Sequence, residues 1–465
     1  MAPFRGVRYI PHRASGIANV TSPPYDVIGA TKLDELLLAD PHNVVRLILP
    51  ARTGPDSEGG EGRAAGEGRA GEDSAHADGT GGDANAQAAR RLHEWLDAGI
   101  LTPDPEPSLY VYEQSLPDGL LQRGVIALVQ VGDPASSGIS PHEDVLPGPV
   151  RDRCELMAAT RANLEPIFLV YEGGSAPRGG TSWLTDHVAA TRPPLVTAET
   201  PDGITHRLWR LADPAEHAAV VADLATRTAL IADGHHRYAA YRELRDAMHA
   251  TGHGSAGQGD RGEQGAPWDY GLAFLVDADA YPPALGAIHR VIPGLAPDRA
   301  RRLAEQASFT VRSLDGIRPG DTSPEGLGQA LRCLAKAGHD GPAFLLAGDT
   351  GWWLATSPDP ALVDAAMPAG ASPEWRGLDA AILQRVLLPR AWGITDSEDS
   401  VLVCHDPAEA VATAVAAKDG LAVLLNPVPF GIVRNIARHG ECVPRKSTSF
   451  GPKPRSGLVL RGFDF

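Results

Sequence analysis

Short apolar runs alternate with amphipathic stretches along most of the chain. The apolar runs are bounded by Gly, Pro, Asp or Ser, which is typical of buried strands. The strands predicted in this way are 108–113, 125–131, 167–171, 229–232, 271–276, 343–346 and 421–425. Apolar residues near i, i+3 and i+4 predict helices over 86–98, 151–163, 237–249, 297–306, 378–388 and 407–417. The pattern therefore predicts a mixed α/β (α+β) chain, and it leaves the pairing order of the strands open.

Two stretches interrupt this pattern. Residues 54–87 hold ten Gly and eight acidic residues, with Ala as the one apolar type, so they bury too little surface to offset the entropy of ordering. Residues 251–267 contain six Gly and indicate a flexible loop. The expected segments are 1–53, the N-terminal part of a globular core; 54–87, a disordered insertion; 88–250, the core with a catalytic turn; 251–267, a flexible loop; and 268–465, a C-terminal part that closes the site.

The overall charge limits the partners of the chain. Lys and Arg number 42 and Asp and Glu 58, so the formal net charge is 42 − 58 = −16. Because a field of this sign repels polyanions, the sequence argues against binding of nucleic acid or of an anionic membrane. A phosphate site in such a chain has to be a local basic island.

The cysteines and the N-terminal sequence bear on compartment and metal use. The four cysteines, at 154, 333, 404 and 442, lie too far apart for a CxxC zinc site or a disulfide framework. We therefore expect no metal site made of protein ligands, and a reducing, cytoplasmic location. The chain starts without the apolar core of a signal peptide, and no run is long enough to predict a membrane span.

The motif with the most side chains suited to catalysis or anion binding is Asp233-Gly234-His235-His236-Arg237, which follows a predicted apolar strand and begins a predicted helix. A helix start favours an anion, and Gly234 lets the backbone approach a ligand closely. Arg237 has a fork of donors for phosphate or carboxylate, and Asp233 or a histidine could accept the proton of an attacking hydroxyl. The alternative is a plain strand-to-helix turn in which Asp233 caps the helix and the histidines are solvated.

A second candidate is the C-terminal run from Val443 to Gly457, which has four cations and four hydroxyls. Lys446, Ser447, Thr448 and Lys453 could bind phosphate oxygens. The run lacks the Gly-rich half of a Walker loop, and a solvated tail is the alternative.

A third candidate lies earlier in the chain than these two. Glu143 beside His142 could act as a general base. The predicted helix that follows places Arg153 and Arg161 on roughly one face, with Asn163 at its end, as further phosphate ligands. Exposed ion pairs explain much of the same pattern.

Two shorter pairs could line a substrate pocket. His289-Arg290 stands at the end of an apolar run. Tyr25-Asp26 follows two prolines that fix the local backbone, and it reaches a pocket if the turn packs beside Asp233. A structural turn is the alternative.

Taken together, these segments resemble the domain of unknown function 1015 family of bacterial and archaeal proteins. The segments that carry the resemblance are Phe4–Gly6 with Arg8-Tyr9, Pro23–Ile28, Asn43–Leu47, His142-Glu143 with Asp152-Arg153, Thr160–Asn163, Ile231–Tyr238, His289-Arg290 and Pro444–Thr448. The Asp-Gly-His-His-Arg turn is also similar to the signature of the ParB and sulfiredoxin-like superfamily. That superfamily includes nucleotide-dependent free-serine kinases, CTP-binding ParB proteins and sulfiredoxin. The resemblance implies a ParB/sulfiredoxin-like nucleotide-binding core, elaborated by additional strands and helices.

The leading hypothesis is a nucleotide-dependent phosphotransferase that acts on a small hydroxyl metabolite, with free serine as the best single substrate. Asp233, His235, His236 and Glu143 are the expected catalytic residues. The expected phosphate and nucleotide ligands are Gly234, Arg237, Arg153, Arg161, Asn163, Lys446, Ser447, Thr448 and Lys453, and the pocket residues are Tyr25, Asp26, His142, His289 and Arg290. The resemblance implies ADP or ATP with Mg²⁺ as the phosphoryl donor. The alternatives are a ParB-like nucleotide-binding regulator without metabolite chemistry and a phosphatase that uses the same site.

Overall fold

The protein consists of two units, each built from separate stretches of the chain. A computed structural model describes residues 1–13, 16–50, 80–133, 137–174, 179–251, 265–397 and 399–465. Unit 1 comprises Met1–Pro141, Val145–Pro283 and Pro452–Phe465, and unit 2 comprises His142–Asp144 and Ala284–Gly451. The polypeptide therefore passes from one unit to the other at 141/142, 144/145, 283/284 and 451/452.

Unit 1 is built around a mixed sheet in the order β5-β10-β7-β11-β4-β3-β9-β8. These strands are β3 (Leu109–Ser115), β4 (Leu121–Gln130), β5 (Ile139–Ser140), β7 (Ile167–Tyr171), β8 (Val196–Glu199), β9 (Thr205–Leu211), β10 (Ala229–Asp233) and β11 (Tyr270–Asp277). The β5–β10 and β7–β11 pairs are parallel, and the other neighbours are antiparallel. The order places the end of β10 next to the start of β7, which positions the site described below.

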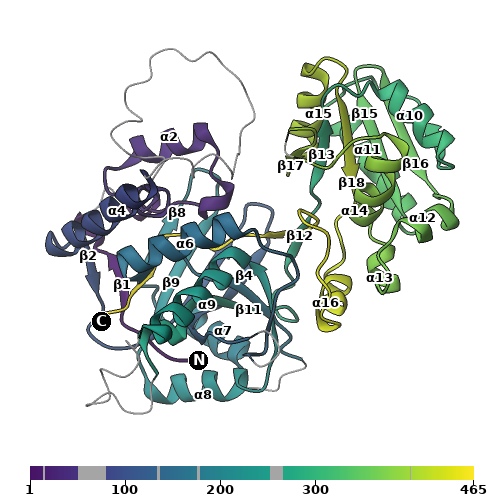
Figure 1. Ribbon diagram of the computed structural model, residues 1–465. Helices are drawn as coiled ribbons and strands as arrows, with labels where there is room; N and C mark the ends of the chain where they lie inside the picture. Colours follow the sequence, from purple (N-terminus) through teal and green to yellow (C-terminus); the bar gives the residue numbers. More distant parts are fainter. Residues whose placement is uncertain (14–15, 51–79, 134–136, 175–178, 252–264, 398) are drawn as a thin grey trace. The chain divides into compact units, whose positions relative to one another are not determined.

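Helices cover the large sheet with their apolar side chains. These are α6 (Pro147–Thr160), α7 (Thr181–Thr191), α8 (Pro214–Leu224) and α9 (His235–Ala250), with α6 and α9 side by side in Figure 1. Along β4, Val125, Ala127 and Val129 belong to the core that contains these helices, because alternate side chains of a strand share one face. Gly271 of β11 leaves room for the ring of Tyr241, which a Cβ there would meet at 2.2 Å.

A smaller antiparallel sheet in unit 1 joins the two ends of the chain. Its order is β2-β1-β20-β6, with β1 (Gly6–Tyr9), β2 (Leu101–Pro103), β6 (Ala162–Asn163) and β20 (Leu460–Gly462). It shares an apolar core with α1 (Ile17–Val20), α2 (Ala30–Ala39), α3 (Val45–Ile48) and α4 (Thr80–Asp97). The short helical turns of this unit are η1 (Pro11–Arg13), η2 (Tyr25–Val27) and η5 (Pro267–Asp269).

Unit 2 has its own sheet and its own apolar core. The sheet order is β14-β16-β15-β18-β13-β17, with β13 (His289–Ile292), β14 (Thr310–Ser313), β15 (Ala343–Gly348), β16 (Gly351–Thr356), β17 (Leu402–Cys404) and β18 (Leu421–Leu425). A separate antiparallel pair joins β12 (Ala284–Gly286) to β19 (Ser449–Gly451). The helices are α10 (Pro297–Gln306), α11 (Pro324–Gly338), α12 (Pro360–Ala366), α13 (Pro373–Arg376), α14 (Asp379–Ile382), η6 (Leu383–Ala391), α15 (Pro407–Ala416) and α16 (Phe430–Arg438).

The structure confirms each strand and helix predicted from the pattern, with changes to the bounds of several helices. The predicted helix 151–163 begins earlier, at Pro147, because proline is tolerated in a first turn, and it ends at Thr160 because Arg161 turns left-handed with φ 49°. The predicted helix 378–388 is α14 continued by η6, a π-helix that contains Pro389.

The segment boundaries expected from composition also change. Helix α4 begins at Thr80, inside the stretch 54–87, and Asn85 and Ala88 are buried, so residues 80–87 belong to a helix of unit 1. Residues 54–79, and 252–264 of the expected loop, lie outside the described residues. The expected boundary at 268 falls inside unit 1, because β11 pairs with β4 and β7. Among the described helices, none is both long and apolar enough to cross a membrane.

Candidate functional site

The candidate site of unit 1 starts at the turn from β10 to α9. Asp233 ends the strand, Gly234 has φ 90° and ψ 32°, and His235 begins the helix. A Cβ on Gly234 would lie 3.1 Å from Arg237 Nε and 3.1 Å from Ile167 Cγ2. Glycine is therefore required here both for its left-handed backbone and for the room it leaves.

Asp233 does not cap the helix, so the capping alternative is wrong. The N-cap is Gly234, and it makes no side-chain cap. The buried carboxylate instead contacts two cations: its Oδ2 accepts from Arg237 Nη2 at 2.5 Å, and its Oδ1 lies 2.6 Å from Lys453 Nζ. Both oxygens are thus occupied, and the two positive charges stabilise the ionised carboxylate.

Lys453 joins three distant parts of the chain. Its ammonium donates to Asp26 Oδ2 at 2.7 Å while it also contacts Asp233. Burial by itself would lower the pKa of Lys453, but the carboxylates of Asp233 and Asp26 outweigh it and raise that pKa above its ordinary value. The turn that carries Tyr25 and Asp26 therefore packs beside the Asp-Gly-His-His-Arg turn, as its pocket assignment requires.

Arg237 is buried and largely committed to the protein. Its Nη1 donates to the Pro166 carbonyl at 2.5 Å, and its Nη2 donates to Asp233. Its Nε has no hydrogen-bond partner among the described residues. Burial opposes the charge, but Glu165, Asp233 and Asp26 raise the pKa of the guanidinium. Arg237 is thus placed to orient Asp233, and in this arrangement its two terminal nitrogens are not available to grip a phosphate.

Glu165 belongs to the site although it was not among the residues predicted. Its Oε1 accepts from the Tyr25 N–H at 3.1 Å and from Ser456 Oγ at 2.8 Å. The Tyr25 ring lies 4.4 Å from the guanidinium carbon of Arg153, and burial is the main cause that raises the pKa of Tyr25. The sequence signal was a carboxylate directly before Pro166 and a buried strand, which is weak by itself.

The three ligands predicted on helix α6 and after it separate in the structure. Arg153 is buried at the site, donates from Nη1 to Ile48 O at 2.7 Å, and pairs with Asp152. Arg161 is exposed and pairs with Asp464. Asn163 lies in β6, where its Oδ1 accepts from Arg461. Arg161 and Asn163 therefore have structural partners away from Asp233, and their assignment as phosphate ligands is withdrawn.

The two histidines of the motif differ in their surroundings. His236 accepts the Leu146 N–H through Nε2 at 3.1 Å, at the N-cap of α6. His236 therefore contacts the first turn of α6, and its assignment as a catalytic residue stays a prediction. His235 is half-buried at the first residue of α9.

The remaining predicted residues belong to unit 2, where they surround the loop 444–448. His142 Nε2 lies 2.9 Å from Thr448 Oγ1, and Glu143 Oε1 accepts the Lys446 N–H at 3.3 Å. The Ser447 hydroxyl donates to the Pro444 carbonyl. The two residues expected to bind phosphate through their hydroxyls are buried, and these hydroxyls contact the Pro444 carbonyl and His142, so their assignment is withdrawn.

The pair His289-Arg290 makes hydrogen bonds to the backbone of unit 2. Arg290 Nη2 donates to the Lys446 carbonyl at 2.8 Å. His289 Nδ1 accepts the Leu425 N–H at 3.3 Å, and burial lowers the pKa of His289 to about 4. His289 is a neutral residue inside the sheet, so its assignment to a substrate pocket is withdrawn.

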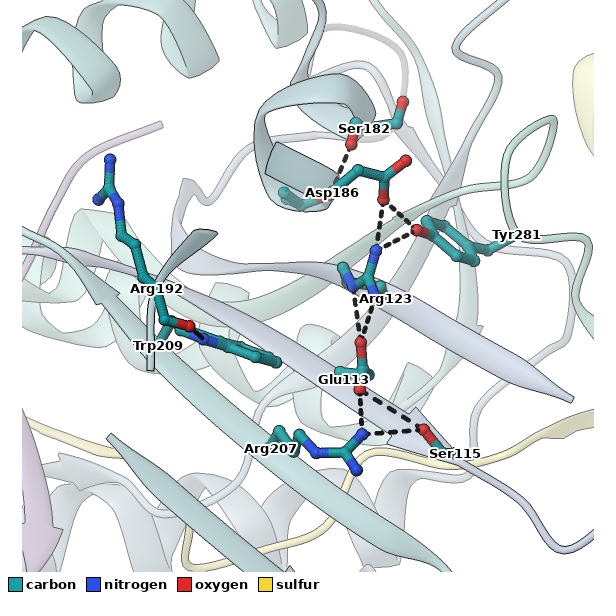
Figure 2. A network of polar contacts seen from close by, with 10 residues as sticks. Glu113, Ser115, Arg123, Ser182, Asp186, Arg192, Arg207, Trp209 and Tyr281 are labelled. Carbon is teal, nitrogen blue, oxygen red and sulfur yellow. Dashed lines mark hydrogen bonds and ion pairs between the residues drawn. The ribbon is translucent and has the colours of Figure 1, made fainter. Parts of the chain in front are cut away.

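A second network of charges in unit 1 is complete without a ligand. Figure 2 shows Glu113 between Arg123 and Arg207, with Asp186 and Tyr281 at the far end of Arg123. Arg123 Nε donates to Glu113 at 2.8 Å, Arg207 Nη1 donates to the other Glu113 oxygen at 2.6 Å, and Tyr281 donates to Asp186. Because each carboxylate and each guanidinium already has a partner of opposite charge, this network stabilises the sheet and is not a candidate site.

The fold and site define a mixed α/β protein whose first unit gathers buried charges at a strand-to-helix turn. A family model described as "Protein of unknown function (DUF1015)" matches residues 1–381, and the chain belongs to that family. The match ends before the C-terminal segment that holds Lys446 and Lys453. A search of curated proteins finds no match.

Several solved structures are remotely similar in fold. A free serine kinase mutant in complex with AMP has 11% identity and a TM-score of 0.34, and the alignment covers 70% of this chain and 87% of that one. SbnI with a C-terminal truncation, from Staphylococcus aureus, has 11% identity and a TM-score of 0.34 over 72% and 87% of the two chains. A conserved hypothetical protein from Pyrococcus furiosus has 12% identity and a TM-score of 0.32 over 70% and 90%. Likenesses at these TM-scores do not define a shared site or activity.

Proposed function

We propose that unit 1 is a nucleotide-dependent phosphotransferase that acts on a small hydroxyl metabolite, with free serine as the first substrate to test. The observation that carries the proposal is the ammonium of Lys453, held between Asp26 and Asp233 at the start of α9. A helix start and a fixed cation together suit a phosphoryl group, and a carboxylate in contact with them suits proton transfer. The ParB/sulfiredoxin-like core expected from the turn is part of this proposal.

The residue roles follow from exposure and pairing. Asp26 is the more exposed of the two carboxylates, at 27% against 9% for Asp233, so it is the acceptor for the hydroxyl proton. The hydroxyl oxygen then bonds to the transferred phosphorus while the bond from phosphorus to the nucleotide oxygen breaks. Lys453 and the start of α9 stabilise the charge on the phosphoryl oxygens. Asp233 and Arg237 hold Lys453 in place.

The donor set fits a nucleotide that brings its own Mg²⁺. Among the described residues, no group of three or more His, Cys, Asp or Glu could hold a metal ion. Mg²⁺ in such sites keeps several waters and is bound largely through the substrate phosphates, so the nucleotide would bring most of its ligands. When bound, the ion neutralises charge on the phosphates.

The test is a product assay on the full-length protein. The protein is incubated with Mg²⁺, ADP or ATP, and a panel of hydroxyl metabolites that includes serine, and phosphorylated products are followed by phosphorus NMR. We expect a phosphate monoester in the wild type and a loss of at least about 100-fold in rate for Lys453→Met and Asp26→Asn. Lys32→Met, which removes an exposed lysine of the same unit, is the matched control.

The outcomes separate the alternatives. Nucleotide binding without any product would reject the kinase and leave a nucleotide-binding regulator. Release of inorganic phosphate from a phosphate monoester, with no transfer to a hydroxyl, would indicate a phosphatase. Wild-type turnover in Lys453→Met would remove the site from the reaction.

A further inference from the structure

The loop 444–448 of unit 2 is fixed by contacts to its backbone. Glu143 accepts the Lys446 N–H, Arg290 donates to the Lys446 carbonyl, and Gln384 Nε2 donates to the Arg445 carbonyl at 3.1 Å. These contacts hold Lys446 in a left-handed conformation with φ 56°, which is unfavourable for a residue other than glycine. The surrounding unit thus imposes one conformation on the loop.

The fixed backbone presents two cations. The side chains of Arg445 and Lys446 are half-buried, and neither has an ion-pair partner in the described part of the chain. The hydroxyls of Ser447 and Thr448 are used internally, as described above. The functional groups that remain for a ligand are therefore the guanidinium of Arg445 and the ammonium of Lys446.

A third positive charge lies beneath the loop. The described hydrogen-bond partners of Arg290 are the carbonyls of Ile288, His289 and Lys446, and none is a carboxylate. Burial lowers the pKa of Arg290, while Asp396 and Glu143 partly offset that effect through space. Arg455 of unit 1 is also bonded to carbonyls, but Arg290 differs because the residue it holds is itself an unpaired cation.

We propose that the loop 444–448 is a binding site of unit 2 for the phosphate group of a small anion. Arg445 and Lys446 contact the phosphate oxygens, and buried Arg290 strengthens the positive potential of the site. Among the described residues, the charged side chains hydrogen-bonded to the loop backbone are one carboxylate, Glu143, and one guanidinium, Arg290, so the two side-chain cations of the loop are left to be neutralised by a ligand. A dianionic phosphate matches this balance better than a single carboxylate. The site does not depend on phosphotransfer by unit 1.

The experiment is a calorimetric titration of the full-length protein with inorganic phosphate at low salt, which measures the dissociation constant. Lys446→Gly is the informative variant, because glycine adopts the left-handed backbone without strain and the loop keeps its conformation. We expect binding to weaken about 10-fold in Lys446→Gly and further in Arg445→Gln/Lys446→Gly. Lys418→Gln, which removes an exposed lysine of unit 2, should bind phosphate like the wild type.

Further arms identify the source of the phosphate and the unit that binds it. Phosphoserine and ADP replace inorganic phosphate, and the tighter ligand shows whether a metabolite or a nucleotide occupies the loop. Lys453→Met should leave the binding that depends on Lys446 intact. The proposal is overturned if Arg445→Gln/Lys446→Gly binds phosphate as tightly as the wild type, or if Lys453→Met removes all binding. Neither result depends on whether the protein transfers a phosphoryl group.

Discussion

Gly234 sets the geometry of the candidate site because two constraints meet on one residue. Its backbone is left-handed, and its missing side chain leaves the space that the Arg237 guanidinium and Ile167 occupy. An added methyl group has to displace Arg237, whose contact with Asp233 orders the other cation, Lys453. The site is therefore sensitive to a change that alters no charge.

Gly234→Ala tests this dependence. We expect a loss of about 2–4 kcal/mol in the free energy of unfolding, from backbone strain and from overpacking against Arg237. Gly119→Ala is the matched control, since Gly119 also has φ 90° but a methyl group added there would meet nothing within 4 Å, and it should lose only the strain of about 1–2 kcal/mol. Urea unfolding measures both. Equal losses in the two variants would show that the contact with Arg237 is unimportant.

At the residue scale, the sequence predicted the site in part. Asp233, Gly234 and Arg237 were found because they are adjacent and follow an apolar run. The pairing of Lys453 with Asp233 and Asp26 joins residues that are far apart in the chain, and no local pattern encodes it. Glu165 was missed for the same reason, because its role depends on Tyr25 and Ser456.

Among the elements, strand β3 depends on a buried charge. Glu113 has 4% of its side chain exposed and is paired with both Arg123 and Arg207, from the strands on either side of β3. Replacing it removes the carboxylate that Arg123 and Arg207 share and leaves Arg123 with Asp186 as its carboxylate partner. The network of Figure 2 then becomes a source of instability.

Glu113→Gln should lower the free energy of unfolding by about 3–5 kcal/mol, the usual result of removing one member of a buried ion pair. The control is Glu35→Gln, because Glu35 pairs with Lys32 on the surface and such pairs contribute about 0–1 kcal/mol. Urea unfolding at neutral pH measures the difference. A loss below about 1 kcal/mol for Glu113→Gln would contradict a stabilising role for the network.

A half-buried carboxyl group, that of Asp379, should make the stability of unit 2 depend on pH. Asp379, at the start of α14, accepts the Ala343 N–H at the first residue of β15. Burial is the main cause that raises its pKa from 3.8 to about 6, against hydrogen bonds from Ala343 and Asn426. The folded state therefore holds this proton more tightly than the unfolded state. The stabilisation is complete below about pH 4 and is lost as the pH rises to about 6.

Asp379→Asn should remove the loss of stability at higher pH, because the amide keeps an acceptor oxygen and carries no charge. Relative to the wild type, we expect the variant to be more stable by about 1–3 kcal/mol at pH 8, and to have no such advantage at pH 4. Urea unfolding at the two pH values gives the comparison. An equal difference at both values would show that Asp379 does not bind a proton in this range.

Several helices and strands could be predicted accurately from the pattern of apolar residues. The strand 167–171, the strand 421–425 and the helix 297–306 have the predicted bounds. Each strand is an unbroken apolar run, the helix has apolar residues at helical spacing, and all three are bounded by Pro, Gly or polar residues. The π-helix η6 was predicted as an ordinary helix, since a π-helix has no periodic signature of its own and contains Pro389. The left-handed end at Arg161 is another backbone choice that composition does not encode.

For the whole molecule, the main feature of the topology is that the segment Pro452–Phe465 returns from unit 2 to unit 1. Strand β20 lies between β1 and β6, and Leu458, Val459 and Leu460 are buried. The sequence predicted one continuous C-terminal part over 268–465, because composition carries no information on which distant strands pair. The division into units depends on those long-range pairs.

Removal of residues 452–465 should unfold much of unit 1 while unit 2 stays folded, since the removed segment carries β20, Arg455 and Lys453. Hydrogen exchange with mass spectrometry measures protection in both units. We expect peptides from β1 and η2 to lose protection and peptides from β15 and β18 to keep it. As the control, a chain that ends after Leu460-Arg461-Gly462 should keep protection in both units.

The four crossings between the units also fix an order of events during synthesis. Unit 2 is complete once residue 451 has left the ribosome, whereas unit 1 still lacks its middle strand β20 and the lysine of its site. The part of unit 1 made before residue 284 therefore lacks the strand between β1 and β6 during the whole time in which unit 2 is made and folded. Nascent unit 1 is the part of this protein that we expect chaperones to bind, because the segment 452–465 both closes its sheet and completes its site.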